Sequence, residues 1–424
     1  MRALLLILIA SSALGQGRFD RFNQRTDQGR STRGFEQSNY AFFEFAPTSG
    51  AGMGAACACA TITGAKGETV TLTRASDATC SKQGLATTGI ANGDLVTCTT
   101  NQPRVESSGG VLGLRVDPSA TNVCTRFIDY TNAAWADIGT PTPTTGQTSP
   151  WAGTYATSAV LYDDNDGAAF EGRTQTVTVA AAATYTMSCY VKAGTLASWT
   201  LSLDGTTASG TGLSSTTWSL VSVTDASSSG VAIAAQILNG STAAGTGTVV
   251  WGGCQVEAGA VVTAVQPTVA AAAGRSADAP TVSLGSGTWG CEAASFSVAG
   301  HNASGSNQRV LTLAVDASNL YDQYINFSGA SLQHFTFLAA TTRQHTTSNA
   351  PAVARSVSRA VYRQNGTTLV TELDGTTTSS TPSAYTALTG TTTLHLGKYT
   401  SGGFELSGII SRIQVDPSPS RCTQ

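Results

Sequence analysis

Short segments in which apolar and polar residues alternate follow one another along most of this chain. Val70 and Leu72 alternate with threonines, and Met187, Cys189 and Val191 share one face. An alternation of period two, broken by Gly, Asp and Asn, predicts antiparallel strands with one buried face. Further segments of this kind lie at 176–179, 199–203, 231–237, 295–300, 309–316, 324–329, 333–339, 358–366, 368–375, 392–399 and 408–416.

The composition agrees with a chain built from strands. Charged residues make up only 12% of the 424 residues, and glycine occurs 45 times. A helical protein of this size would carry more Lys, Glu and Leu. The alanine runs 180–183 and 270–273 are short and uncapped, which predicts connectors. We therefore expect an all-β chain of tandem antiparallel β-sandwiches.

The net charge limits the class of partner. At −3 it offers no large basic field to attract nucleic acid. Beyond the N-terminal leader no stretch is long and apolar enough to span a membrane, so we expect neither nucleic acid nor a membrane span.

The N-terminus is typical of a secretory signal. Arg2 precedes an apolar run from Ala3 to Ala10. Small residues at Ser11 and Ala13, or at Ala13 and Gly15, fit a cleavage site. The leader at 1–15 predicts secretion and an extracellular protein; the alternative is an uncleaved apolar anchor within an assembly. The Arg- and Gln-rich segment 16–50 has no apolar face and is expected to be a flexible arm.

Nine cysteines suit an oxidising compartment. Cys80 and Cys98 flank a predicted hairpin, and Cys291 and Cys422 bracket the last predicted domain, so each couple is a candidate disulfide. The odd number leaves at least one thiol free or bonded to another chain.

A series of motifs between Pro103 and Pro280 resembles a family. It begins with PRVESSGGVLGLRVDPSATN, continues through YTNAAW, TYTMSCYVKAG, TWSLVSVT and VVWGGCQVEAGAVVTAVQP, and ends with AAAGRSADAP. The series resembles tail-fibre-like and other virion proteins of bacteriophages, and related exported bacterial proteins. The resemblance implies a carbohydrate-binding-module-like jelly roll. The C-terminal third, which ends in LHLGKYTSGGFELSGIISRIQV, resembles a concanavalin A-like or laminin-G-like sandwich.

The resemblance and the strand pattern together give a domain plan. We expect a small β-rich region at 51–110, the jelly roll at 111–284 and the second sandwich at 285–424. The leader and the many cysteines depart from the phage proteins and favour an exported cellular protein; a virion surface appendage is the alternative. Fibre-like relatives imply a homo-oligomer, with a trimer as the first hypothesis.

Gln255 and Glu257 stand out within the apolar run 249–267. Alternation places both on the face opposite Cys254 and Val256. We expect them to hydrogen-bond loop backbone near a sheet edge, where a carboxylate that accepts N–H groups stays ionised. A catalytic role is the alternative.

The sequence offers few catalytic signals. The four histidines lie in the last domain, and no G-x-S-x-G or H-E-x-x-H motif is present. The glutamates are scattered, so no carboxylate pair for glycoside hydrolysis stands out. We expect no enzymatic activity, and a glycan hydrolase stays the third alternative.

Two kinds of binding site are open. Asp163, Asp164 and Asp166 cluster before Gly167 and could hold a structural calcium ion in a tight loop; a solvated turn is the alternative. Sugars stack their C–H groups on aromatic rings, which makes aromatic residues outside the core candidates for glycan contact. The candidates are Trp151, Tyr155, Tyr162, Trp199 and Trp289.

These patterns together predict a surface adhesion protein that binds glycans weakly and through many copies. The alternative is a fibre, virion or matrix subunit that binds no sugar. In the family motifs, Trp135, Trp218 and Trp251 are expected to be core residues.

Overall fold

The computed structural model describes residues 41–44, 62–63, 68–81, 95–108, 111–289, 291–298, 308–316, 319–326, 331–338, 341–346, 358–365, 368–373, 376–380, 388–397 and 406–416. These residues are almost all in antiparallel strands, and the one helical element described is the 3-10 turn η1, Gly153–Tyr155. The predicted all-β class, built from antiparallel β-sandwiches, is confirmed. The leader, and all of the predicted arm except 41–44, lie outside the described residues.

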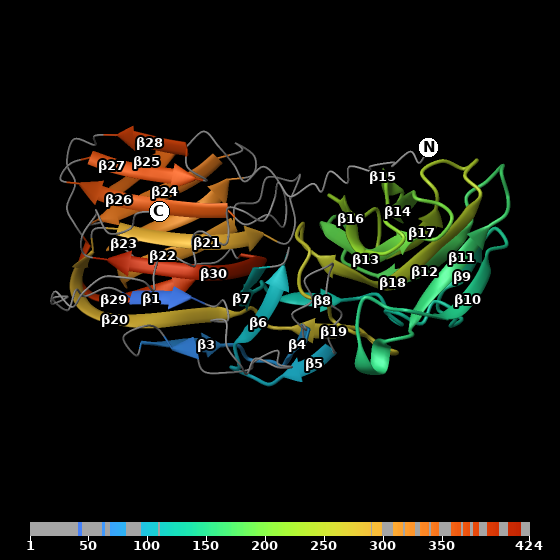
Figure 1. Cartoon of the computed structure of the whole chain (residues 1–424), viewed down its shortest axis with the longest axis horizontal. Coiled ribbons are helices and arrows are strands. Elements are labelled where there is room, and N and C mark those ends of the chain that lie inside the picture. The colour runs from blue at the N-terminus through green and yellow to red at the C-terminus, as the bar shows by residue number, and fades with distance from the viewer. Residues whose placement is uncertain are drawn as a thin grey trace, which may run out of the picture. The chain divides into compact units, whose positions relative to one another are not determined.

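One sandwich consists of two eight-stranded sheets (Figure 1). The first has the order β28-β27-β26-β21-β30-β7-β6, with β1 also on β30, and its strands are β1 (Ala41–Glu44), β6 (Arg104–Ser108), β7 (Val111–Val116), β21 (Cys291–Val298), β26 (Ser358–Asn365), β27 (Thr368–Leu373), β28 (Thr376–Ser380) and β30 (Gly408–Asp416). The second has the order β2-β3-β20-β29-β22-β23-β24-β25, and its strands are β2 (Ile62–Thr63), β3 (Thr69–Thr73), β20 (Ala279–Trp289), β22 (Gln308–Asp316), β23 (Asn319–Asn326), β24 (Ser331–Leu338), β25 (Thr341–Thr346) and β29 (Leu388–Leu396).

The inward side chains of these two sheets form one core. Leu114, Phe296 and Ile413 from the first sheet pack in the same buried cluster as Leu313 and Leu394 from the second. Such alternating inward residues are the usual core of two stacked sheets. We call this unit the host sandwich.

The other sandwich is the jelly roll, with a seven-stranded and a five-stranded sheet. The seven-stranded sheet has the order β10-β11-β18-β13-β16, with β8 and β19 beside β18, and contains β8 (Ala120–Asn122), β10 (Thr142–Gln147), β11 (Ala159–Asp164), β13 (Tyr185–Ala193), β16 (Ser219–Asp225), β18 (Gly247–Ala258) and β19 (Ala273–Arg275). The five-stranded sheet has the order β15-β14-β17-β12-β9 and contains β9 (Ala136–Ile138), β12 (Gly172–Thr178), β14 (Trp199–Leu203), β15 (Thr206–Gly210) and β17 (Ala232–Asn239).

Local sequence explains the elements of the jelly roll. The β14–β15 hairpin turns at Asp204 and Gly205, whose φ angles of 51° and 85° belong to the turn that favours Asp-Gly. Trp135 and Trp251 are buried in the core, as predicted. The alanines 180–183 connect β12 to β13, also as predicted, whereas the second alanine run, 270–273, runs into β19 at Ala273.

The jelly roll is inserted within the host sandwich. Strand β7 ends at Val116, strand β20 begins at Ala279, and all the jelly-roll strands lie between them in the chain. The described strands β3 and β6 of the predicted 51–110 region, and β7 of the predicted jelly roll, pair in the host sheets. The domain boundaries that follow from these strand pairs therefore differ from the predicted ones. Alternation in the sequence identifies a strand but not the strand with which it pairs.

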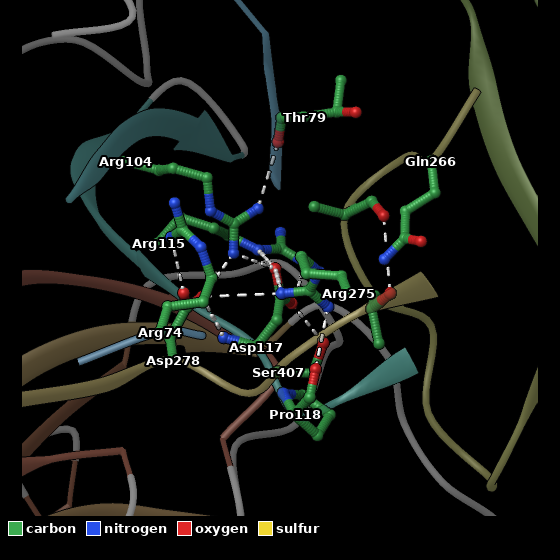
Figure 2. Close-up of polar contacts among 12 residues, drawn as sticks. Arg74, Thr79, Arg104, Arg115, Asp117, Pro118, Gln266, Arg275, Asp278 and Ser407 are labelled. Carbon is green, nitrogen blue, oxygen red and sulfur yellow. Dashed lines mark hydrogen bonds and ion pairs between the residues drawn. The ribbon is translucent and has the colours of Figure 1, made fainter. Parts of the chain in front are cut away.

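The two ends of the insertion meet at a buried cluster of charges (Figure 2). The Asp278 amide donates to the Asp117 carbonyl over 2.9 Å, and the Asp117 amide donates to Asp278 Oδ2 over 3.1 Å. Arg104 donates to both carboxylates, at 2.8 Å for Asp117. Arg115 binds Asp117 through two hydrogen bonds of 2.8 and 2.6 Å, and Arg74 binds Asp278 over 2.9 Å. The predicted first and last motifs therefore supply the two sides of one junction.

Both host sheets and the jelly roll contribute to this junction. The Ser407 hydroxyl, before β30, lies 3.0 Å from Asp117 Oδ1 and 2.6 Å from the carbonyl oxygen of Val262. Arg275 donates to the Pro118 carbonyl over 2.8 Å and lies 3.4 Å from Asp117. Burial by itself raises the pKa of Asp117, but Arg115, Arg275 and Arg104 outweigh it and hold that pKa well below its usual range. Asp117 therefore stays ionised although it is buried in the junction.

Replacing Asp278 with asparagine tests the junction. The substitution leaves Arg74 and Arg104 buried with less compensating charge, so we expect the free energy of unfolding to fall by about 3 to 5 kcal/mol. Denaturant unfolding followed by circular dichroism measures the loss. The matched control is Asp129→Asn at an exposed position, which should change the free energy by about 0.5 kcal/mol or less. Equal effects of the two substitutions would contradict the role of the junction.

Candidate functional site

The outer face of the seven-stranded sheet carries the candidate site. In β13, Met187 and Cys189 point into the core, so Ser188, Tyr190 and Lys192 point outward. Outward residues of neighbouring strands extend this row. We define the outer-face platform as Leu161, Tyr190, Lys192, Trp218 and Leu220.

The platform combines apolar surface with one cation. The Lys192 ammonium lies 5.1 Å from the centre of the Trp218 ring, a distance suited to a cation–π interaction. Trp218 is buried against this outer face rather than in the core between the sheets. Tyr190 and Leu220 face each other across β13 and β16 and are only half-buried. Trp218 is therefore buried, as expected of a core residue, but it lies on the outer face of the sheet and not in the core between the two sheets.

A glycine bulge shapes the face beside the platform. The β13–β18 register shifts between Cys189 and Val191, where Gly252 and Gly253 lie on β18. A Cβ on Gly253 would lie 2.1 Å from the Phe127 ring, so only glycine lets this ring approach the sheet. The two glycines of the motif WGGCQVEAG therefore make room for ring packing.

Four aromatic rings pack above this bulge. Phe127 and Trp151 have ring centres 5.1 Å apart, and Trp151 and Tyr190 are also 5.1 Å apart with planes at 75°. Tyr155 meets Phe127 edge-on at 6.2 Å. Such tilted and edge-to-face pairs stabilise one another and fix the ring positions.

A small hollow opens between the bulge and the platform. The space inside it is about 10 Å³, which is room for roughly one water molecule and far below the ~300 to 1,000 Å³ of typical ligand clefts. The lining mixes apolar and polar groups: Phe127, Ser188, Tyr190, Leu220, Gly253, Gln255, Thr263 and Val265. No Asp, Glu or His side chain is among these lining residues.

The predicted aromatic residues fall in different places. Trp151 belongs to the ring cluster but is only 4% exposed, and Tyr155 is half-buried beside it. Tyr162 lies fully buried in the jelly-roll core and offers no face to a ligand. Trp199 is half-buried at the five-stranded sheet, and the side chain of Trp289 lies outside the described residues. The structure thus brings only Trp151 and Tyr155 to the candidate site.

Sequence reasoning missed Ser188, Tyr190 and Leu220. Ser188 and Tyr190 occupy outward positions in a segment whose inward residues had been recognised from the alternation, and Leu220 lies opposite Tyr190 in the motif TWSLVSVT. The complementary face of TYTMSCYVK was the available signal. A strand pattern alone does not tell which outward face is covered by loops.

Gln255 and Glu257 bind a neighbouring loop through hydrogen bonds. Thr263 donates to Glu257 through its hydroxyl over 2.5 Å and its amide over 3.2 Å. Gln255 donates to Glu257 over 2.9 Å and to the Thr263 carbonyl over 3.1 Å, and accepts from the Gln266 amide. The predicted bonding to loop backbone is confirmed. These side chains hold the segment 263–266 onto the sheet.

Two details of that prediction are wrong. Strand β18 lies between β11 and β13, so it is not an edge strand. Near Gln255 and Glu257, the segment 122–127 takes the place of β11 beside β18. Burial raises the pKa of Glu257 to about 7 despite its bonds to Thr263. The carboxyl group therefore gains and loses its proton near neutral pH.

The Asp163–Asp166 loop is held by backbone hydrogen bonds. Asp164 accepts from the amides of Asp166 and Glu171, at 3.2 and 3.3 Å. Glu171 accepts from the amides of Thr140 and Asn165, each over 2.8 Å. Among the described residues no three or more His, Cys, Asp or Glu side chains gather as a metal site. Calcium at Asp163, Asp164 and Asp166 stays a prediction.

The disulfide seen in the jelly roll joins Cys189 to Cys254. These residues face each other across β13 and β18, with Cα atoms 4.1 Å apart. Both had been assigned to inward faces, but their pairing required the register. In the β4–β5 pair (Ala78–Ser81, Leu95–Cys98), Cys80 lies opposite Val96 and Cys98 opposite Ala78.

The two predicted disulfides stay predictions. The side chains of Cys80 and Cys291, and all of Cys422, lie outside the described residues.

Comparisons with known proteins found similar solved structures but no matching family. A scan against protein-family models found no match, and neither did a search of curated proteins. The CBM40 of Ruminococcus gnavus IT-sialidase, bound to alpha2,3 sialyllactose, is 13% identical over 31% of this chain and 77% of that chain, with a TM-score of 0.27. Mouse laminin alpha1 domains LG4-5 are 12% identical over 64% of this chain and 92% of that chain, with a TM-score of 0.27.

A third solved structure is the CBM22-1-CBM22-2 tandem of Xyn10C from Paenibacillus barcinonensis. It is 12% identical over 71% of this chain and 97% of that chain, with a TM-score of 0.24. Likeness at these values carries no conclusion about a ligand. Across the described residues, no helix has both the length and the apolar character needed to cross a membrane.

Replacing Gly253 with alanine tests the bulge. The new methyl group would collide with the Phe127 ring, so we expect a loss of about 1 to 3 kcal/mol in unfolding free energy. Tryptophan fluorescence reports on the jelly roll, because five of the six tryptophans lie between residues 135 and 251. Gly167→Ala is the control, since its Cβ would meet nothing closer than 3.6 Å. A Gly253→Ala protein as stable as the control would contradict the packing described.

Replacing Glu257 with glutamine tests the raised pKa. The carboxyl group titrates at about 7 when folded but near 4.5 when unfolded, so folding retains its proton between these pH values. Its contribution to stability is therefore greatest below pH ~4.5 and declines as the pH rises to ~7.

We expect the unfolding free energy of the wild type, minus that of Glu257→Gln, to fall by an amount on the order of 3 kcal/mol across this window. Denaturant titrations at a series of pH values measure the difference, from which other titrating groups cancel. A difference that is constant or rises with pH would refute the assignment.

Proposed function

We propose that this protein is a non-enzymatic surface adhesion protein whose jelly roll binds glycans. The observation that carries the proposal is the half-buried Tyr190 ring on the outer face, beside a hollow that is also lined by hydroxyl and amide groups. A sugar offers C–H groups that pack on a ring and hydroxyls that require hydrogen bonds. The platform with its hollow supplies both kinds of contact on one face.

The absence of acid and base groups from the hollow supports a binding role. Glycoside hydrolysis uses two carboxyl groups on either side of the bond that breaks. None of the residues that line the hollow has a carboxyl group. Glu257 lies behind Gln255 and Thr263, is only 1% exposed and is hydrogen-bonded to both. We therefore assign Glu257 to the fold rather than to catalysis.

The proposed setting is outside the cell. The predicted leader directs export, and the Cys189–Cys254 disulfide is of a kind that persists in oxidising compartments. A shallow site gives weak binding to one glycan, so adhesion would need several copies held together. The homotrimer is part of this proposal, and a virion surface appendage is the alternative setting.

A structural subunit without sugar binding is the second candidate function. The observation that favours it is the burial of Trp151 and Tyr162, which removes two predicted sugar-binding rings from solvent. Ordered self-assembly together with no glycan binding would support this candidate and exclude the first.

Glycan-array binding by the purified full chain and its Tyr190→Ala variant tests the proposal. Loss of the stacking ring should weaken binding about tenfold or more, while Thr176→Ala, exposed on the other sheet, should bind as the wild type does. Thermal melting establishes that both variants are folded. Parallel arrays with a calcium chelator test the predicted calcium. Binding that survives Tyr190→Ala unchanged would refute this site.

A further inference from the structure

The carboxyl group of Glu257 binds a hydroxyl and a carboxamide at the same time. The Thr263 hydroxyl donates to Glu257 Oε1 over 2.5 Å, and the Gln255 side-chain nitrogen donates to Glu257 Oε2 over 2.9 Å. The Gln255 nitrogen also donates to the Thr263 carbonyl over 3.1 Å, so the carboxamide lies directly against Thr263. One buried site therefore contains an alcohol, an amide and a carboxyl group that binds both.

The alcohol and the carboxyl group suit the first step of an acyl transfer. A hydroxyl becomes a nucleophile when a base within hydrogen-bond reach takes its proton, and a third group usually holds that base in place. Glu257 lies within this reach of the Thr263 hydroxyl and is held by the Thr263 amide and by Gln255. Because burial raises the pKa of Glu257 to about 7, its carboxyl group can both accept and return a proton near neutral pH.

The carboxamide of Gln255 is placed as the acceptor of such a transfer. Its carbonyl oxygen accepts a hydrogen bond from the backbone N–H of Gln266 over 3.1 Å. An N–H group aimed at a carbonyl oxygen stabilises the negative charge that develops there when a nucleophile adds. Gln255, Glu257, Thr263 and Gln266 are each at most 5% exposed, so water, the competing nucleophile, is largely excluded.

We propose that the Thr263 hydroxyl adds to the side-chain carbonyl carbon of Gln255 and forms an ester bond within the chain. Glu257 takes the hydroxyl proton as the C–O bond forms and passes it to the Gln255 nitrogen as the C–N bond breaks. The alcohol and the amide thus become one ester and one molecule of ammonia, with no oxidant or reductant. The chain reacts once and turns over no substrate, so Glu257 keeps its role in the fold.

The ester would strengthen a loop that already links the two sandwiches. Val262, next to Thr263, accepts a hydrogen bond of 2.6 Å from Ser407 of the host sandwich. Hydrogen bonds alone allow such a loop to open locally, whereas a covalent bond to β18 would prevent this opening. The inference goes beyond glycan binding and does not depend on it.

Mass spectrometry of the full chain tests the proposal. With the cysteines reduced and alkylated, the wild type should lack one ammonia, about 17 Da, relative to the mass of its sequence. A protease that cleaves after glutamate cuts at Glu257, between the two partners, and gives the fragments 172–257 and 258–292. These fragments should stay joined in the wild type and separate in mild alkali, which cleaves esters faster than amides.

Substitutions assign the parts of the reaction. Thr263→Val removes the nucleophile at nearly constant volume and should abolish the joined fragments, whereas Thr263→Ser keeps a hydroxyl and should form them. Glu257→Gln removes the acid–base group and should lower the yield about tenfold or more. That yield is measured from the intact mass, because this variant lacks the cleavage site.

Thr268→Val is the matched control. Thr268 is another buried threonine of the same loop, but its hydroxyl donates to the Cys124 carbonyl over 2.6 Å and not to a carboxyl group. This variant should form the ester as the wild type does. Circular dichroism melting curves establish which variants are folded, and Thr263→Ser keeps the test valid if Thr263→Val does not fold.

Three results would overturn the proposal. The first is a folded wild-type chain that has the full mass of its sequence and gives two separate fragments. The second is joined fragments in Thr263→Val, which would place the bond at another residue. The third is an equal yield in the wild type and Glu257→Gln, which would remove the carboxyl group from the reaction.

Discussion

The buried arginine–aspartate junction is the interaction on which the rest of the structure depends. An inserted domain needs its two ends close together, and here Asp117 and Asp278 meet through backbone and carboxylate hydrogen bonds. Both carboxylates bind Arg104, and Arg115 and Arg74 each bind one of them. Because these charges are buried, loss of one partner leaves the others uncompensated. The host sandwich can therefore carry the insertion without a break in its core.

One loop after β18 links this junction to the candidate site. The Val262 carbonyl lies 2.6 Å from the Ser407 hydroxyl, which also contacts Asp117. The next residue, Thr263, is bound by Glu257 and lines the hollow. The polar residues of the apolar run thus have a structural purpose: they fix a loop whose other contacts reach the host sandwich. A candidate site beside this loop is shaped by residues far apart in the chain.

Much of the fold was predictable from the sequence. The alternation located the strands, Asp204-Gly205 marked a hairpin, and the tie between Gln255, Glu257 and loop backbone was expected. The insertion was not predictable, because the segments that pair in the host sheets are separated by the whole jelly roll. The candidate site was predictable only in part. Aromatic residues can be read from the sequence, but the core position of Tyr162 and the outward position of Tyr190 depend on packing.

The sequence by itself determined the secondary structure, since a period of two fixes which residues share a face of a strand. It also supplied the aspartates of the junction, together with Arg104, Arg115 and Arg275, within two recognisable motifs, whereas Arg74 comes from outside them. Only the tertiary structure decided the strand partners, the Cys189–Cys254 pairing and the face on which Ser188 meets Leu220 and Val265. The physical reason is that alternation acts over neighbouring residues, whereas pairing, burial and the pKa of Glu257 depend on segments brought together by the two cores.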